Sequence, residues 1–293
     1  MHLSMRDIKK RVIATEKTAK ITKAMNMVSA SKLKVAQRAA EGFRPYMQRI
    51  EEIICSLENS GERIDNPLMI PRVVNKTCYI LLTSDKGLAG PFNTNIFKMY
   101  EEKAKDKNSI VYTLGIKGYF YTKSHKEIKR MNDNIISLPD DVPFENVLGI
   151  VDNILKKYIA KEIDEVVLVY NHFVNTVNIV PSTKVILPIG NVSKEDDSKS
   201  KKTIASSYEF EGGIDSILNA VLPLYLENLV YGTVLDSKAS EHASRMTSMK
   251  NATDNAKDVI SKLSLAYNRA RQAAITLELN DIIGGSNAIS GGE

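Results

Sequence analysis

The stretch that decides the fold is Thr233–Ile283, TVLDSKASEHASRMTSMKNATDNAKDVISKLSLAYNRARQAAITLELNDII, which contains neither glycine nor proline. Glycine and proline weaken a helix more than any other residues, so the stretch is predicted to form one uninterrupted helix. At a rise of 1.5 Å per residue this helix would be about 75 Å long, several times the length of an ordinary globular helix. Its length indicates a rod.

Apolar residues recur along this stretch at the spacing of a coiled coil. The steps alternate between four and three residues, as in a heptad repeat, at Ala256, Ile260, Leu263, Tyr267, Ala270, Ala274 and Leu277. A helix packed on a globular core usually shows a wider apolar stripe. The narrow repeat therefore predicts a left-handed supercoil with a second helix. Gly284 and Gly285 are predicted to end the helix.

The N-terminal end of the chain supplies a second helix. Met1–Glu41 also lacks glycine and proline, and the helix is predicted to continue to about Asn59, with a kink near Gly42 and Pro45. Its seam is predicted from apolar residues that step by four, three and seven, namely Ile21, Met25, Val28 and Val35. Small residues near this stripe, such as Ala24, Ser29, Ala30 and Ser31, allow a neighbouring helix to approach closely. We expect the two end helices to pair as an antiparallel coiled coil.

The region between these helices has the pattern of an α/β domain. Short apolar runs are predicted as strands at Thr77–Thr83, Ser109–Gly115, Glu165–Phe173 and Ile179–Leu187. Helical patterns are predicted at about Asn93–Lys105 and Phe144–Ala160. Alternating strands and helices predict a mostly parallel sheet, whereas the short link between the last two strands predicts an antiparallel pair.

The expected fold class is α/β plus coiled coil, with an antiparallel coiled coil of the N- and C-terminal helices and an inserted Rossmann-like α/β domain. The expected limits are 1–59 for the N-terminal coiled-coil helix, 76–190 for the α/β domain and 214–293 for the C-terminal coiled-coil helix. Residues 191–213 begin with a polar and charged run and are predicted to form a mobile loop or linker.

Positive charge is concentrated at the N-terminal end. The whole chain has a formal net charge of +5, whereas residues 1–40 contain ten Lys/Arg and two acids, or +8. A basic helix on a near-neutral body predicts an acidic partner. Nucleic acid and an anionic membrane are weaker alternatives, because the helix has neither aromatic residues among its lysines nor a face suited to insertion into lipid.

The sequence contains no recognisable catalytic, cofactor or metal motif. The loop Ser84–Gly90 (SDKGLAG) fits neither G-x-G-x-x-G nor G-x-x-x-x-G-K-[ST], and is predicted to be a tight strand-to-helix turn. The four histidines are scattered, and Cys55 and Cys78 lack metal-type spacing and are not expected to form a disulfide. The sequence contains no run of about 18 consecutive apolar residues, so no membrane span is predicted. We expect no catalytic, cofactor-binding or metal-binding residues; the alternative is a stand-alone nucleotide-binding α/β enzyme.

Three regions of the chain carry motifs that occur together in one protein family. The motifs are Lys20–Leu33 (KITKAMNMVSASKL), Thr83–Asn93 (TSDKGLAGPFN), and a C-terminal group of Ala239–Met246 (ASEHASRM), Met249–Asn255 (MKNATDN) and Tyr267–Thr276 (YNRARQAAIT). In this order they resemble the gamma subunit of the rotary F-type ATP synthase. Ala89 and Pro91 depart from the family's usual cysteine and small residue, although the turn is kept.

The resemblance implies a central-stalk rotor subunit that is not itself catalytic. In this family the coiled coil turns inside a ring of three alpha and three beta subunits, and it couples ion flow to ATP synthesis or hydrolysis. The implied partners are the alpha3-beta3 hexamer, the epsilon subunit and the membrane c-ring, with no nucleic acid and no direct small-molecule substrate. The implied location is peripheral, on the cytoplasmic face of the bacterial cell membrane.

The resemblance also implies a set of rotor–stator coupling residues, which are Met25, Arg245, Gln272, Thr276, Lys20 and Lys23. Met25 matches a position beside an acidic loop of a beta subunit, with Arg245 nearby on the partner helix. Gln272 and Thr276 match positions that hydrogen-bond to a catch loop of a beta subunit. Lys20 and Lys23 are included because they neighbour Met25 in the sequence.

Overall fold

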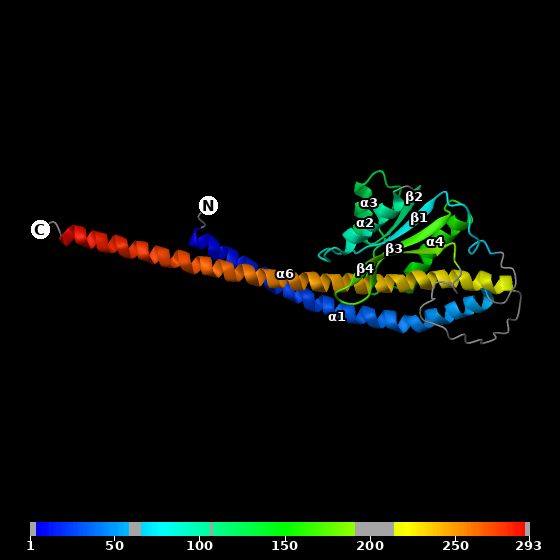
Figure 1. The fold of residues 1–293 in the computed structure, drawn as a ribbon, viewed down its shortest axis with the longest axis horizontal. Coiled ribbons are helices and arrows are strands. Elements are labelled where there is room, and N and C mark those ends of the chain that lie inside the picture. Colours follow the sequence, from blue (N-terminus) through cyan, green and yellow to red (C-terminus); the bar gives the residue numbers. More distant parts are fainter. Residues whose placement is uncertain (1–3, 59–65, 106–107, 191–213, 291–293) are drawn as a thin grey trace. The chain divides into compact units, whose positions relative to one another are not determined.

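Two long helices form the ends of the chain in the computed structural model, which describes residues 4–58, 66–105, 108–190 and 214–290 (Figure 1). Helix α1 spans Met5–Glu58 and helix α6 spans Ile214–Ser290. The two predicted long helices are therefore confirmed, and α1 continues through Pro45. The loop predicted at 191–213 lies outside the described residues.

The predicted end of the C-terminal helix is wrong. Gly284 and Gly285 lie inside α6, which continues to Ser290. Glycine costs a helix about 1 kcal/mol relative to alanine, but it keeps both the donor and the acceptor of the backbone ladder. A pair of glycines can therefore be carried within a helix that is already 70 residues long by Ile283.

A four-stranded sheet forms the centre of the α/β region. Its strands are β1 (Thr77–Leu82), β2 (Ser109–Leu114), β3 (Glu165–Phe173) and β4 (Ile179–Leu187). The spatial order is β2-β1-β3-β4. As predicted, β1 pairs in parallel with β2 and β3, and β3 pairs antiparallel with β4.

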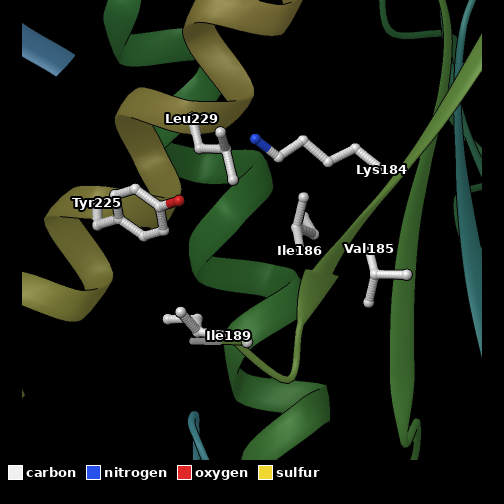
Figure 2. Close-up of a pocket in the computed structure, with 7 residues that line it drawn as sticks. Lys184, Val185, Ile186, Ile189, Tyr225 and Leu229 are labelled. Carbon is white, nitrogen blue, oxygen red and sulfur yellow. The ribbon is translucent and has the colours of Figure 1, made fainter. Parts of the chain in front are cut away.

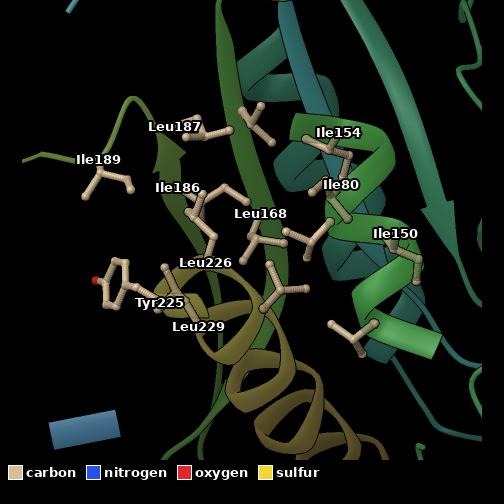
Figure 3. Close-up of a cluster of buried hydrophobic side chains, with 14 of the residues drawn as sticks. Ile80, Ile150, Ile154, Leu168, Ile186, Leu187, Ile189, Tyr225, Leu226 and Leu229 are labelled. Atoms are coloured by element: carbon tan, nitrogen blue, oxygen red, sulfur yellow. The ribbon is translucent and has the colours of Figure 1, made fainter. Parts of the chain in front are cut away.

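Helices cover both faces of this sheet, and the alternation of side chains along β1 separates two hydrophobic cores. Cys78, Ile80 and Leu82 belong to a core shared with α4 (Phe144–Ile159) and with segments of α1 and α6 (Figure 3). Tyr79 and Leu81 belong to a second core, formed with α2 (Phe92–Ala104). The α/β layers expected from the sequence are present.

A short helix that the sequence did not predict, α3 (Ile116–Ser124), follows β2. Glycines at its start concealed it, and the structure explains them. Gly115 has a φ of +95°, and a Cβ there would lie 2.1 Å from the Thr83 carbonyl oxygen. At Gly118 a Cβ would lie 2.8 Å from Thr83 Oγ1. These glycines let α3 lie against the end of β1.

The described chain divides into two compact units. One contains Ser29–Arg245, and the other contains Met1–Val28 together with Met246–Glu293. Helices α1 and α6 each contribute to both units. The domain limits expected from the sequence stay a prediction.

Helix α6 also includes an 18-residue window that is apolar and long enough to cross a membrane. Half of this window is buried within the protein, as is common for a core helix of a folded domain.

The predicted seam of α1 is wrong, because Ile21, Val28 and Val35 are 60%, 54% and 64% exposed. The buried positions lie one residue further along, at Thr22, Ser29 and Ala36. Every step of an alternating four–three repeat from Ile8 to Leu57 falls on a buried or half-buried residue. Helix α1 therefore has a heptad repeat, but its register could not be predicted from apolar residues, because threonine, asparagine and serine occupy several of its positions.

Candidate functional site

The unit that contains Met1–Val28 and Met246–Glu293 is held together by a narrow seam that combines polar contacts with small and apolar residues. Thr22 Oγ1 and Thr253 Oγ1 lie 2.7 Å apart, and the Asn26 side-chain amide donates to the Met246 carbonyl over 2.7 Å. Positions 22 and 26 thus face 253 and 246, which makes the pairing antiparallel. Small side chains let the two backbones approach closely, and they leave most of each helix surface free.

The predicted heptad of α6 follows this seam over most of its length. Ala256 is buried, and Ile260, Leu263 and Tyr267 are half-buried, as expected for residues that face α1. Leu277 is 64% exposed, so the prediction is wrong at this position. If both helices rise equally from the Thr22–Thr253 contact, position 277 lies beyond Met5, where α1 begins. Figure 1 shows α6 continuing past the first residues of α1.

The cationic side chains of α1 form an exposed face. Nine of the ten Lys/Arg in residues 1–40 are exposed, and Lys32 is half-buried. Among the described residues, only Lys32 of these ten has an ion-pair partner, Asp140. The charge is therefore not neutralised within the described chain, and it is available to an acidic surface.

The coupling residues predicted on α1 lie in this cationic region. Lys20 and Lys23 are exposed, and Met25 is half-buried beside the seam residue Asn26. Lysine ammonium groups and a thioether at these positions can contact a partner, but they have no chemistry of their own without one.

The coupling residues predicted near the end of α6 are also exposed. Gln272 and Thr276 are one helical turn apart, and the Thr276 hydroxyl donates to the Gln272 carbonyl over 2.9 Å. The Gln272 amide has no hydrogen-bond partner among the described residues. A side-chain amide and a hydroxyl one turn apart can both bond to a loop that approaches this face.

Arg245 differs from the other predicted coupling residues, because it is buried and belongs to the unit Ser29–Arg245. Its Nη2 lies 2.7 Å from Glu241 Oε1 and donates over 3.2 Å to the Lys86 carbonyl. Its Nε donates over 3.3 Å to the Gly87 carbonyl. Within this unit the guanidinium holds α6 against the loop 84–90.

The loop 84–90 is a docking surface for α6. Besides the two bonds to Arg245, the Ala89 carbonyl accepts a hydrogen bond from Ser244 Oγ over 2.5 Å. Asp85 accepts bonds from the backbone N–H groups of Ile116 and Leu138, each over 3.0 Å. Leu88 and Gly90 have positive φ angles of 60° and 56°. The predicted tight turn is present, and its carbonyls at Lys86, Gly87 and Ala89 accept bonds from α6.

A buried ionic network surrounds this contact. Lys238 Nζ lies 3.0 Å from Glu241 Oε2 and donates to the Leu138 carbonyl, so Glu241 bridges Lys238 and Arg245. His242 Nε2 lies 3.2 Å from Asp140 Oδ1. Buried charges of this kind are tolerated because each has an opposite charge and further hydrogen bonds.

Burial and charge act in opposite directions on the pKa values in this network. Burial lowers the pKa of His242, and Glu241 and Asp140 offset that effect only in part. Burial alone would raise the pKa of Asp140, but the bond from Lys32 and the nearby cationic side chains lower it overall. At neutral pH, Asp140 is therefore an anion beside an uncharged His242.

Sequence reasoning missed Asp140, Lys32 and Lys238 as members of this network. The residues are separated by about a hundred positions, so spacing alone could not join them. One signal was available in the sequence. Lys238 and Glu241 are opposite charges three residues apart on a helix, with the small residues Ala239 and Ser240 between them, which is a pattern that allows a close, buried ion pair.

A pocket between β4 and α6, lined by Lys184, Ile186, Ile189, Tyr225 and Leu229, has room for about one water molecule (Figure 2). No group of three or more metal-ligating side chains occurs among the described residues. Burial raises the pKa of the Cys78 thiol to about 12, so it stays protonated and unreactive at neutral pH.

Comparison with known proteins gives a consistent result over the whole chain. The family described as ATP synthase matches residues 4–289. The chain is 45% identical to the ATP synthase gamma chain of Staphylococcus saprophyticus and 42% identical to that of Macrococcus caseolyticus, covering 98% of this chain and 99% of each relative.

Solved structures show the same fold. The chain aligns with a chain of the central stalk and c-ring structure of Tetrahymena thermophila mitochondrial ATP synthase, at 25% identity and a TM-score of 0.57, covering 79% of this chain and 99% of that one. It also aligns with a chain of Euglena gracilis mitochondrial ATP synthase at 16% identity and a TM-score of 0.67, covering 98% and 95%. On the full-length identity to its bacterial relatives, the chain belongs to the ATP synthase gamma chain family.

Proposed function

We propose that this chain is the central-stalk rotor of an F-type ATP synthase. It transmits torque between the membrane c-ring and the three catalytic beta subunits, and so couples ion flow to ATP synthesis or hydrolysis. The observation that carries the proposal is the unit with Thr22 and Thr253 at its seam, in which two long helices pair through small polar contacts and leave a cationic face exposed. An elongated, charged surface of this kind suits a shaft that must turn inside an acidic sleeve without a fixed register.

The chain acts without catalysis of its own. Two observations support this part of the proposal: the loop 84–90 uses its backbone groups to hold α6, and the pocket beside Tyr225 admits about one water molecule. A nucleotide site needs a cleft of hundreds of cubic ångströms. The alternative of a stand-alone nucleotide-binding enzyme has no support from the relatives.

The proposed partners follow from the charge and from the family. The alpha3-beta3 hexamer surrounds the paired helices, and the α/β region contacts the epsilon subunit and the c-ring. The chain binds no nucleic acid and no small-molecule substrate directly. Its place is the cytoplasmic face of the bacterial cell membrane, where it is held peripherally through these partners.

The proposed coupling residues are those on the exposed surfaces of α1 and α6. Lys20, Lys23 and Met25 face the acidic loop of a beta subunit, and Gln272 and Thr276 hydrogen-bond to its catch loop. Arg245 is buried, and its proposed contribution is indirect: it holds α6 against the loop 84–90 through Glu241 and the loop carbonyls.

Reconstitution with the alpha and beta subunits of the same organism tests the function. The purified chain alone should neither hydrolyse ATP nor bind it, and adding it to the alpha and beta subunits should yield a stable complex with ATP-driven rotation of a bead fixed to the chain. Nucleotide turnover by the isolated chain, or a hexamer that excludes it, would overturn the proposal.

Met25 offers a test of the coupling residues. Met25→Lys would add an attraction between the rotor and the acidic loop and lower the number of ions pumped per ATP hydrolysed. Met27→Lys is the matched control, because Met27 is exposed and lies about 200° around the helix from Met25. An unchanged ratio for Met25→Lys, or an equal fall for Met27→Lys, would contradict the assignment.

A further inference from the structure

The segment 132–143 between β2 and α4 has little regular structure but many fixed contacts, and we call it the strap. Its first part is bound to the sheet. Asn132 Oδ1 accepts from the Thr113 backbone N–H over 2.9 Å, and Asn132 Nδ2 donates back to the Thr113 carbonyl over 3.1 Å. Ser137 Oγ donates to Asp85 over 2.6 Å. The strap is therefore fixed to the carboxyl ends of β1 and β2.

The far part of the strap is bound to both long helices. The Leu138 carbonyl accepts from buried Lys238 of α6, and the Tyr231 hydroxyl of α6 donates to the Val142 carbonyl over 3.4 Å. Asp140 contacts α1 and α6 together, with Oδ2 2.5 Å from Lys32 Nζ and Oδ1 3.2 Å from His242 Nε2. One carboxylate thus links two helices and, through the strap, the sheet.

The bond between Lys32 and Asp140 contributes little to stability. The two side chains are 39% and 40% exposed, and ion pairs in such surroundings have small net free energies because water already solvates both charges. Asp140 nevertheless contacts both helices from a segment that is itself bonded to the sheet. The contact is better explained by what it does to relative motion than by what it adds to folding.

We infer that the strap is a joint that passes torque between the α/β domain and the segments of α1 and α6 in this unit, in addition to their shared apolar core, with Asp140 and Lys32 as its positioning residues. This inference rests on the proposed rotor function. Elsewhere in the unit α1 meets α6 through side-by-side packing, such as Phe43 against Tyr231 with ring centroids 5.1 Å apart. Packing of that kind resists separation, whereas a tether from a third element also resists sliding of one helix around the other.

A stiffness measurement on the assembled rotor tests this joint. The full chain is assembled with the alpha and beta subunits, and a bead is attached to a cysteine introduced at exposed Lys123, with Cys55→Ser in every arm. The variance of the bead angle during catalytic pauses is inversely proportional to torsional stiffness. Lys32→Met should raise this variance, whereas Lys32→Arg should restore it.

Two controls separate transmission from folding and from general charge effects. Asp141→Asn removes an exposed charge from the strap itself, beside Asp140, and should leave the variance unchanged. Salt should raise the variance of the unmodified rotor towards that of Lys32→Met, since salt screens exposed ion pairs, and should not change the variance of Lys32→Met itself. The denaturation midpoint of Lys32→Met should stay close to that of the parent.

The outcomes are distinguishable. An unmodified chain that assembles and rotates, together with a Lys32→Met rotor of the same stiffness, would overturn the joint and leave the rotor function standing. An equal loss of stiffness in Asp141→Asn would also overturn it. An unmodified chain that does not assemble or rotate would instead overturn the proposed function.

Discussion

The same two helices are packed by different chemistry in the two units. Within Ser29–Arg245, Ile54 and Leu57 of α1 and Leu218 and Leu222 of α6 are fully buried in one core with the sheet. Within the other unit, the seam runs through hydroxyl and amide contacts such as Thr22 with Thr253. The first region gains its stability from burial of apolar area. The second gives up that stability and keeps a thin profile with exposed, charged sides.

Two leucines of α6 would show this contrast most strongly. Leu222→Ala removes a fully buried side chain from the core beneath the sheet and should lower the free energy of unfolding by about 4 kcal/mol. Leu277→Ala, at a 64% exposed position of the same helix, should change it by no more than about 0.5 kcal/mol. Urea denaturation followed by tyrosine fluorescence measures both, and similar losses would contradict the division.

Two ion pairs allow the same comparison for charge. Glu241→Gln leaves Lys238 and Arg245 buried without their shared carboxylate, and should cost about 3 kcal/mol in the same assay. Asp254→Asn breaks an exposed pair with Lys257 and should cost less than about 1 kcal/mol. If the two variants were equally stable, the buried network would not hold α6 in place.

The hydroxyl contact in the seam predicts that a paired substitution of Thr22 and Thr253 is tolerated better than a single one. Thr22→Val alone should destabilise the seam by about 1 kcal/mol, because it removes the hydroxyl pair with Thr253. Replacing both threonines by valine should recover part of this loss, since an apolar contact between the two valines takes the place of the hydroxyl contact. Hydrogen exchange of residues 5–28 and 246–275 measures it locally. A double variant less protected than the single one would show that the hydroxyls are needed for the seam.

The contrast between the units also explains which predictions from the sequence succeeded. The strands, the parallel order and the antiparallel β4 were predicted, because apolar runs such as Tyr79–Leu82 in a buried sheet carry their own signal. The register of α6 was predicted where alanine, isoleucine and leucine occupy the seam. The register of α1 was displaced by one residue, because Thr22 and Ser29 are buried while Ile21 and Val28 are exposed.

The joint around Asp140 could not be predicted from the sequence, for a different reason. Its members come from α1, the strap and α6, and their pairing depends on the fold that brings Lys32 and His242 to one carboxylate. The motif around Arg245 was noticed through its resemblance to a family, which implied a contact with a partner. The structure adds an internal role for the same residue, against the carbonyls of loop 84–90.

The smallest expected effect is a change in the pH dependence of stability at the joint. Burial keeps the pKa of folded His242 below its ordinary value of 6.5, although Glu241 and Asp140 oppose the shift and Arg245 and Lys238 reinforce it. Below about pH 6.5 the unfolded chain therefore binds a proton that the folded chain does not. The free energy of unfolding decreases as the pH is lowered, until His242 in the folded chain is also protonated.

His242→Gln should remove this contribution, which is at most about 1.4 kcal/mol per pH unit. The free energy of unfolding of the variant, measured between pH 7.5 and about 5, should decrease less steeply than that of the parent. Parallel curves would mean that His242 gains its proton in the folded chain as readily as in the unfolded one. Asp140 would then hold an imidazolium, and the joint would be two cations on one carboxylate instead of the single ion pair with Lys32.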